Sequence, residues 1–184
     1  QVVEKSGAKA VAWNRCYEPY AIARDKRLKA ELKDAGIEVS SHNAALLHEP
    51  WTIETGQGGP YKVYTPFWKA LKAKEVPEPY PDARKVDFAK PPKGERLEDW
   101  ELLPTKPDWA GGLRAAWTPG EAGAKQRLAD FLDERIGDYG RARDYPGEAG
   151  TSGLSPHLHW GEIGPRQIWQ AVLHHVDREG GGET

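Results

Sequence analysis

The chain has 184 residues, and its 26 Lys and Arg nearly balance its 28 Asp and Glu, which leaves a formal net charge of -2 and excludes a broad basic surface for nucleic acid. A single cysteine excludes an intramolecular disulfide framework and favours a reducing, cytoplasmic setting. No apolar run approaches the roughly 20 residues of a membrane-spanning helix, so we expect a soluble protein that does not bind a membrane.

The beginning of the chain predicts a βαβ unit with two parallel strands. Residues 9–14 form a short apolar run, residues 23–35 have the apolar spacing of a helix, and residues 37–42 alternate between apolar and polar side chains. A parallel pair is buried on both faces and needs flanking strands and helices. We therefore expect the other half of a doubly wound sheet to precede this chain, which starts at Gln1 and contains no methionine.

Residues 75–118 predict a long connector between two domains. They hold seven of the fifteen prolines and show no sustained hydrophobic period. Trp100, Trp109 and Trp117 also lie there, which is not typical of a flexible tether rich in Gly and Ser. We expect these bulky side chains to hold the connector against the surface of a neighbouring domain.

The last part of the chain predicts helices. Thr118–Pro119 combines a side-chain cap with proline at the first helical position, and Ser155–Pro156 and Gly164–Pro165 mark two further helix starts. The sequence then stops in a polar, glycine-rich stretch. We expect a helical domain that continues beyond the end of the chain.

No side chain stands out as a catalyst or a metal ligand. The glycine-rich residues 56–60 lack the spacing of a phosphate loop and predict a turn before a helix at Thr65–Pro66. The four histidines after residue 155 lack the spacing of metal ligands, and Cys16 has no neighbouring His or helix start that would activate it as a nucleophile. We therefore expect any reaction to rest on a bound cofactor.

Residues 139–155 are the strongest candidate for a ligand site. Thr151, Ser152 and Ser155 provide hydroxyls beside two glycines, directly before a helix opened by Pro156. Small residues let the backbone approach a ligand, and the N–H groups at a helix start favour a phosphate. This half of the segment therefore predicts a phosphate contact.

Arg141 and Arg143 lie earlier in the same segment, together with two tyrosines. Their guanidinium groups suit phosphate oxygens, and the tyrosines suit stacking or hydrogen bonding. The alternative is an ordinary helix–loop–helix connection in which Ser155 only caps the next helix. The residues alone leave both interpretations open.

Four blocks of sequence, in order and spacing, strongly resemble the DNA photolyase/cryptochrome family. They are WNRCYEPYAIARD at 13–25, GIEVSSHNAALLHEPW at 36–51, GPYKVYTPFWKA at 59–70 and RDYPGEAGTSGLSPHLHWGEIGPRQIW at 143–169. The resemblance covers nearly the whole chain. It implies an α/β domain that holds an antenna chromophore, and a long loop that leads to a helical domain holding FAD.

The fold class that follows is α/β plus all-α, in three parts. Residues 1–74 would be the C-terminal part of a doubly wound parallel α/β antenna domain. Residues 75–118 would be the interdomain loop, and residues 119–184 the first helices of an all-helical FAD-binding domain. The chain would then be an internal fragment of a longer protein.

The resemblance also implies site residues, carried over only where the residues match. The FAD contacts would be Tyr139, Thr151, Ser152, Gly153, Leu154 and Ser155, most of them around the diphosphate. Arg143 would contact the DNA phosphate backbone. The family commonly reads TSRLSP where this chain reads TSGLSP, so Gly153 removes a cation near the cofactor. This change weakens binding or leaves the missing charge to a residue outside the chain.

A second departure concerns the antenna chromophore. Folate-binding members of the family have an Asn–Glu pair where this chain has Tyr20–Ala21. The difference argues against a methenyltetrahydrofolate antenna and leaves a deazaflavin, another flavin or no second chromophore.

The function that the resemblance implies is light-driven DNA repair, with no catalytic protein side chain and no metal. Reduced FAD, excited by blue light, would donate an electron to a cyclobutane pyrimidine dimer flipped out of damaged DNA, which makes the protein a carbon–carbon lyase that works as a monomer. The alternatives are a cryptochrome, which keeps the flavin and signals without repair, and a non-enzymatic phosphate-binding module. The 184 residues by themselves lack most of the flavin pocket, so we expect them neither to retain FAD nor to repair DNA.

Overall fold

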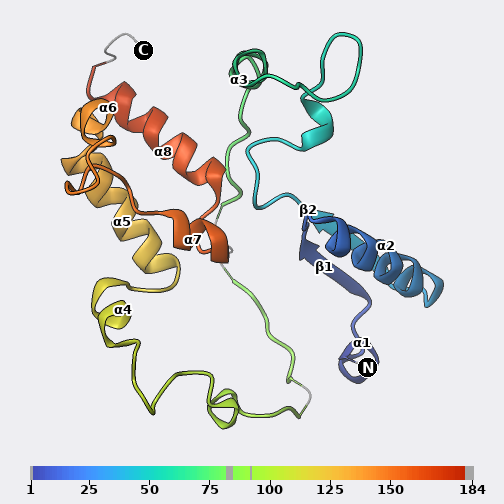
Figure 1. The fold of residues 1–184 in the computed structure, drawn as a ribbon. Coiled ribbons are helices and arrows are strands. Elements are labelled where there is room, and N and C mark those ends of the chain that lie inside the picture. The colour runs from blue at the N-terminus through green and yellow to red at the C-terminus, as the bar shows by residue number, and fades with distance from the viewer. Residues whose placement is uncertain (1, 82–84, 92, 181–184) are drawn as a thin grey trace. The chain divides into compact units, whose positions relative to one another are not determined.

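The computed structural model describes residues 2–81, 85–91 and 93–180. The chain forms two compact units, each built from two separate stretches of sequence. Figure 1 labels the strands and α-helices that are described below. The first unit combines residues 1–42 with 81–118, and the second combines residues 43–80 with 119–184. No helix within the described ranges is long and apolar enough to cross a membrane.

The first unit contains the predicted βαβ arrangement. Its elements are α1 (Val2–Ser6), β1 (Ala10–Asn14), α2 (Pro19–Asp34) and β2 (Glu38–His42). The two strands pair in parallel, with Ala10 opposite Glu38 at one end and Asn14 opposite His42 at the other, which confirms the prediction. The helix begins earlier than the predicted residue 23, because Pro19 suits the first helical turn.

Polar contacts from partly buried positions hold α2 against the two strands. The indole N–H of Trp13 on β1 donates a hydrogen bond of 3.0 Å to the Asp25 carboxylate on α2. The Lys29 ammonium donates to the Ser41 hydroxyl of β2 at 2.6 Å. Ala21, which is 1% exposed, brings the helix close to the sheet. The Arg24 guanidinium hydrogen-bonds Asp25 and thereby lowers the pKa of that carboxyl.

The stretch from residue 81 to residue 118 has little regular structure in its described part. It contains η2 (Leu97–Trp100) and α4 (Gly111–Ala116). The side chains of Trp100 and Trp109 are 55% and 69% exposed, and Trp100 donates its indole N–H to Glu95, a close neighbour in sequence. Packing of these two tryptophans against a neighbouring domain stays a prediction.

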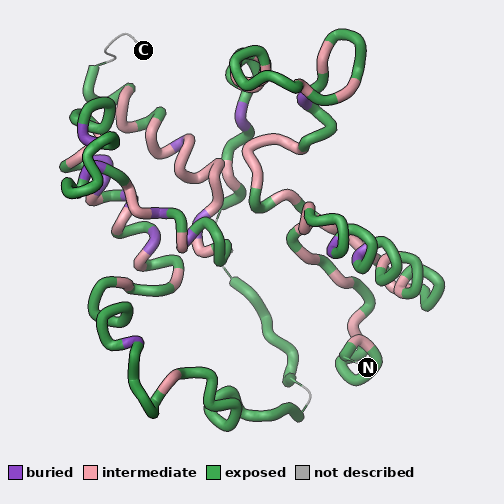
Figure 2. The backbone as a smooth tube through the Cα atoms, viewed as in Figure 1, coloured by how far each residue is buried: buried purple, intermediate pink, exposed green. Residues whose placement is uncertain are grey.

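The second unit is mainly helical. Its elements are η1 (Pro50–Thr52), α3 (Tyr64–Lys72), α5 (Glu121–Glu134), η3 (Ile136–Asp138), α6 (Tyr139–Ala142), α7 (Ser155–Trp160) and α8 (Pro165–Arg178). Its hydrophobic core consists of Ala124, Leu128, Phe131, Leu132, Leu154 and Ile163, with Ile168, Ala171 and Val172 of α8 packed against them. Figure 2 shows the buried positions along α5, which contributes four of the core residues.

Two of the three predicted helix starts are confirmed, and one is wrong. The helices α7 and α8 begin at the proline-containing pairs as predicted, and the Gln167 side chain accepts a hydrogen bond of 2.7 Å from the Gly164 N–H. Helix α5 begins at Glu121 rather than at Thr118–Pro119. The reason is Gly120, whose φ of 98° is incompatible with a helix that runs through from Pro119.

Residues 43–80 pack onto helix α8 within the second unit. The Gln170 side chain donates a hydrogen bond of 2.9 Å to the Val76 carbonyl, and Arg166 donates one of 3.0 Å to the Leu47 carbonyl. The rings of Trp68 on α3 and Trp169 on α8 meet edge to face, with centroids 6.4 Å apart. The predicted domain boundary at residue 74 stays a prediction.

Candidate functional site

The candidate segment begins with α6, and Tyr139 and the residue that follows this helix, Arg143, lie on the same face. Tyr139 and Arg143 are four residues apart, which is one helical turn. The Tyr139 ring packs edge to face on Phe131 of the core, with centroids 5.7 Å apart. The Arg143 guanidinium lies 5.4 Å from the centroid of the Tyr139 ring. The structure therefore brings these two predicted site residues together and anchors them on α5.

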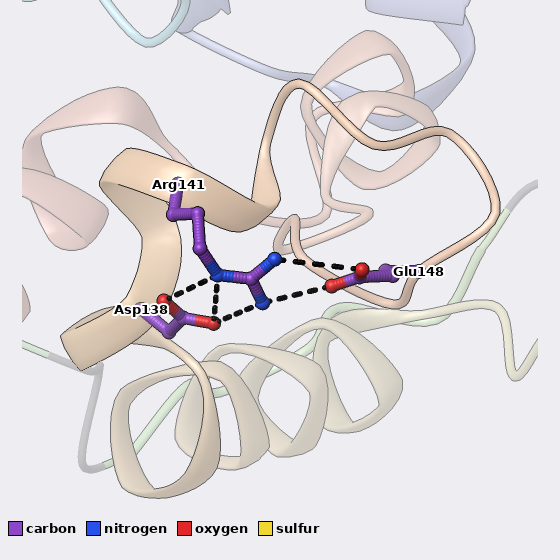
Figure 3. Close-up of polar contacts among 3 residues, drawn as sticks. All are labelled: Asp138, Arg141 and Glu148. Atoms are coloured by element: carbon purple, nitrogen blue, oxygen red, sulfur yellow. Dashed lines mark hydrogen bonds and ion pairs between the residues drawn. The ribbon is translucent and has the colours of Figure 1, made fainter.

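The other arginine of this segment has a structural role. The Arg141 guanidinium hydrogen-bonds the Asp138 carboxylate at 2.6 Å and the Glu148 carboxylate at 2.9 Å, so it closes the loop after α6 (Figure 3). These bonds raise the pKa of Arg141, and the bond from Arg141 lowers the pKa of Asp138. In this structure the donors of Arg141 bind two carboxylates, which favours a structural role over the phosphate contact that its type also suits.

Gly150 joins the two halves of the segment. A Cβ atom built on Gly150 would lie 2.5 Å from both the Cβ and the carbonyl oxygen of Ala142, the last residue of α6. No residue with a side chain fits there without a backbone shift. The close approach places Thr151, the next residue, beside the end of the helix that carries Tyr139.

The predicted phosphate strip, residues 151–155, leaves α7 without a side-chain cap. Ser155 is the first residue of α7 and Leu154 is the N-cap residue, and no side chain caps the helix. Ser155 therefore does not cap α7, while the choice between an ordinary connection and a phosphate contact stays a prediction. Leu154 is 3% exposed and belongs to the core, so only its backbone remains for a ligand.

The hydroxyls of this strip differ in their availability. Ser152 is half-buried and accepts a hydrogen bond of 3.4 Å from the Leu154 N–H. Thr151 and Ser155 are exposed, and their hydroxyls make no hydrogen bond to any residue that the structure describes. Two exposed hydroxyls beside uncapped backbone N–H groups fit the chemistry of phosphate oxygens.

Arg127 of α5 lies against this strip and was not predicted from the sequence. Gly153 has a φ of 63°, and a Cβ atom built on it would lie 2.8 Å from Nη1 of Arg127. No motif connects the two positions, which are far apart in the chain. Their contact depends on how α5 packs, so no local pattern could have indicated it.

His157 has a structural role in the core of the unit rather than the position of a metal ligand. It is 2% exposed, and its Nδ1 lies 2.5 Å from an oxygen of the Glu162 carboxylate. The hydrogen bond from His157, and next the backbone of Gly120, lower the pKa of Glu162. Among the described residues, no three His, Cys, Asp or Glu side chains gather as a metal site would require.

Two further features lie away from the candidate segment. The second unit has a hollow of about 220 Å³ beside the start of α8, and Arg166, Glu78 and Tyr80 are among its lining residues; no predicted site residue lines it.

Tyr20 and Ala21 stand where folate-binding members have the Asn–Glu pair, and they are 73% and 1% exposed. A position as buried and as small as Ala21 offers no polar group to a chromophore.

Comparison with known proteins relates this chain to one family. The family model described as DNA photolyase matches residues 1–83. The deoxyribodipyrimidine photo-lyase of Agrobacterium fabrum is 48% identical over 93% of this chain and 36% of its own length. A solved bacterial class III photolyase from Agrobacterium tumefaciens has a TM-score of 0.90 and 45% identity, over 96% of this chain and 37% of that one. Along nearly its whole length, this chain is similar to members of the DNA photolyase and cryptochrome family.

Both branches of the photolyase and cryptochrome family are represented among the relatives. Cryptochrome-1 of Arabidopsis thaliana is 33% identical over 93% of this chain and 25% of its own length. A cryptochrome structure from Synechocystis, at 21% identity and a TM-score of 0.69, shows the shared fold. The parallel strand pair and the helices agree with the predicted α/β plus all-α class. The chain spans about a third of the length of the photolyases that it matches.

Proposed function

We propose that the full-length protein is a deoxyribodipyrimidine photolyase, a carbon–carbon lyase that splits cyclobutane pyrimidine dimers in damaged DNA under blue light. The observation that carries the proposal is the identity of 48% with a photolyase along nearly the whole chain, against 33% with a plant cryptochrome. The enzyme would act as a monomer on DNA in the cytoplasm.

The residues of the 151–155 strip suit the diphosphate of FAD. Thr151 and Ser155 offer exposed hydroxyls without protein partners among the described residues, and Ser152 adds a third. Leu154 anchors the strip in the core, so these groups are held in place before a ligand arrives. Gly153 contributes its backbone, and Tyr139 lies nearby on α6. When bound and reduced, FAD supplies the electron that splits the dimer.

Arg143 is the residue that we assign to DNA. Its side chain is 55% exposed, and its described carboxylate neighbour, Asp144, is 3.7 Å away, which is a loose ion pair. A DNA phosphate can therefore replace Asp144 as the partner of this guanidinium at little cost in free energy. Contacts of this kind position the protein on DNA, and the low cost of flipping a damaged, poorly stacked base selects the lesion.

The domain assignment belongs to the same proposal. Residues 1–74 would be part of the antenna domain, residues 75–118 the interdomain loop, and residues 119–184 the start of the FAD-binding domain. The buried Ala21 and the exposed Tyr20 support the view that any antenna chromophore is not held as in the folate-binding members. A deazaflavin, a second flavin or no antenna remain for the full-length protein.

The test uses the full-length protein, purified and photoreduced. We expect flavin absorbance in a 1:1 ratio with protein, and loss of pyrimidine dimers from irradiated DNA under blue light but not in the dark. Bound FAD without dimer loss would instead assign the protein to the cryptochromes. Salt-dependent DNA binding without any flavin would overturn the proposal in favour of a phosphate-binding module.

A further inference from the structure

We propose that Arg127 provides the cation that contacts the diphosphate of the cofactor, in place of the side chain that is absent at position 153. The inference rests on the proposed function and identifies a further binding residue for it. The residue lies on a different helix from the strip, and no sequence motif includes it.

The geometry at Gly153 carries the inference. The Arg127 guanidinium packs against the glycine, so that a Cβ atom at position 153 would lie 2.8 Å from its Nη1 and 3.8 Å from its Cζ. Real Cβ contacts are essentially never shorter than 3.0 Å. A side chain at position 153 would therefore require the Arg127 guanidinium to move, whereas glycine leaves the guanidinium in place against the strip.

The backbone and the helix both fix this arrangement. A φ of 63° at Gly153 is strained for any residue with a side chain. On α5, the neighbours of Arg127 include Ala124 and Leu128, which are 0% and 7% exposed and belong to the core. The base of the arginine is thus held rigidly, while its guanidinium reaches the strip that carries the Thr151 and Ser155 hydroxyls.

The chemistry of a guanidinium matches a diphosphate. Its planar N–H donors bind two phosphate oxygens at once, which the ammonium of a lysine does not do. Within the 139–155 segment, Arg141 binds Asp138 and Glu148, and Arg143 faces the Tyr139 ring. The Arg127 guanidinium packs against Gly153 of the strip itself.

The experiment measures flavin affinity in the full-length protein after its cofactor is removed. FAD and riboflavin, which has no phosphate, are titrated at several salt concentrations into wild type, R127A, R127Q and R127K. The matched control is R135A, because Arg135 lies at the end of the same helix and pairs with Glu134 at 3.6 Å. Thermal unfolding of each flavin-free variant checks that it folds.

We expect R127A and R127Q to weaken FAD binding about 10- to 100-fold, the range for a hydrogen bond to a charged group. Riboflavin affinity should stay within about 3-fold, because riboflavin carries no charge for Arg127 to bind. The FAD affinity of wild type and R127K should fall with rising salt, and that of R127A should fall less. The R135A variant should bind FAD like wild type.

The possible failures are distinguishable. If wild type binds no FAD, the proposed function fails and takes this inference with it. If wild type binds FAD and R127A binds it as tightly, with the same salt dependence, the inference alone is overturned. Equal losses for FAD and riboflavin, with unchanged salt dependence, would show that Arg127 only supports the fold, and would also overturn it.

Discussion

Gly150 and Gly153 are both needed at the candidate site, but for different physical reasons. Gly150 is needed because its backbone touches Ala142, so a side chain has no room. Gly153 is needed because its backbone is left-handed, and the Arg127 guanidinium packs into the space beside it. Gly150 therefore fixes the path of the backbone, whereas Gly153 leaves room for the positively charged Arg127 guanidinium.

Replacing Gly150 with alanine tests the close approach. The new Cβ would lie 2.5 Å from the Ala142 carbonyl oxygen, so the backbone of α6 or of the strip must move. We expect Gly150→Ala to lower the free energy of unfolding by about 1–3 kcal/mol, as overpacking does. Urea unfolding measures the change.

The matched control is Gly147→Ala in the same loop. A Cβ on Gly147 meets nothing within 4 Å, and its φ is not positive. This variant should stay within about 0.5 kcal/mol of wild type. Equal stability of both variants would show that the contact between Gly150 and Ala142 does not constrain the segment.

At the scale of residues, the sequence predicted local chemistry better than long-range contacts. The hydroxyls of Thr151 and Ser155 are exposed in the predicted strip. Arg141 was considered for a phosphate contact, but the loop that follows α6 brings the Glu148 carboxylate into hydrogen-bond contact with it. Arg127 was not predicted at all, because its contact with the strip depends on the packing of α5.

Helix α6 owes the geometry of its following loop to the bonds from Arg141 to Asp138 and Glu148. Each of these ion pairs is exposed, so its contribution to global stability is small. Its expected effect is local order. We expect Arg141→Gln to speed amide hydrogen exchange in residues 143–149 several-fold while the melting temperature changes little. Mass spectrometry of exchanged peptides measures this.

The same bonds predict a pH dependence. The bond from Arg141 lowers the pKa of Asp138 from its ordinary value of 3.8, so the contribution of this ion pair to stability is fully present above that pH. It is lost as the pH falls through the lowered pKa of the folded state. We expect an NMR titration to find the Asp138 carboxyl below its ordinary pKa, and to find it raised again in Arg141→Gln. An unchanged titration in that variant would contradict the role of Arg141.

Helix α8 is bound to residues 43–80 through a buried donor. Gln170 is 9% exposed and donates to the carbonyl of Val76, which is 7% exposed. Gln170→Met keeps the volume and removes the donor, so the Val76 carbonyl stays buried without it. We expect a loss of about 1–3 kcal/mol in the free energy of unfolding.

The control for this variant is Gln126→Met on α5. The Gln126 side chain is exposed and hydrogen-bonds Asp130 one turn away. Chemical denaturation should place this variant within about 0.5 kcal/mol of wild type. If Gln170→Met were equally neutral, the bond to Val76 would not hold the two segments together.

At the scale of elements, periodicity and proline positions predicted most of the helices and both strands. The parallel pair and the starts of α7 and α8 follow directly from them. The start of α5 was missed, because the backbone of Gly120 overrides the signal at Thr118–Pro119. The packing of residues 43–80 on α8 was also missed, since it runs through backbone carbonyls that carry no side-chain pattern.

The whole molecule joins stretches that are distant in sequence. The second unit is interrupted by residues 81–118, so its two stretches are held together by packing and hydrogen bonds rather than by a short connection. The bond between Arg166 and Leu47 spans 119 residues of the chain. The order of elements along the chain therefore does not reveal the composition of each unit.

This organisation predicts the result of cutting the chain between the stretches. Residues 85–91 are exposed, so a protease site placed there should be cleaved without prior unfolding. After cleavage, residues 43–80 should stay bound to residues 119–184 through the contacts of Gln170 and Trp169. We expect the nicked 184-residue chain to elute as one species in gel filtration at micromolar concentration.

The control for this experiment is the same cut in a variant whose contacts between the two stretches are weakened. Trp169→Ala removes the ring that meets Trp68, and Gln170→Met removes the donor to Val76. The nicked double variant should separate into two fragments at a concentration where nicked wild type stays together, while both uncut chains elute alike. Separation of nicked wild type itself would mean that packing does not hold the stretches together. The covalent connection through residues 81–118 would then be what keeps the second unit intact.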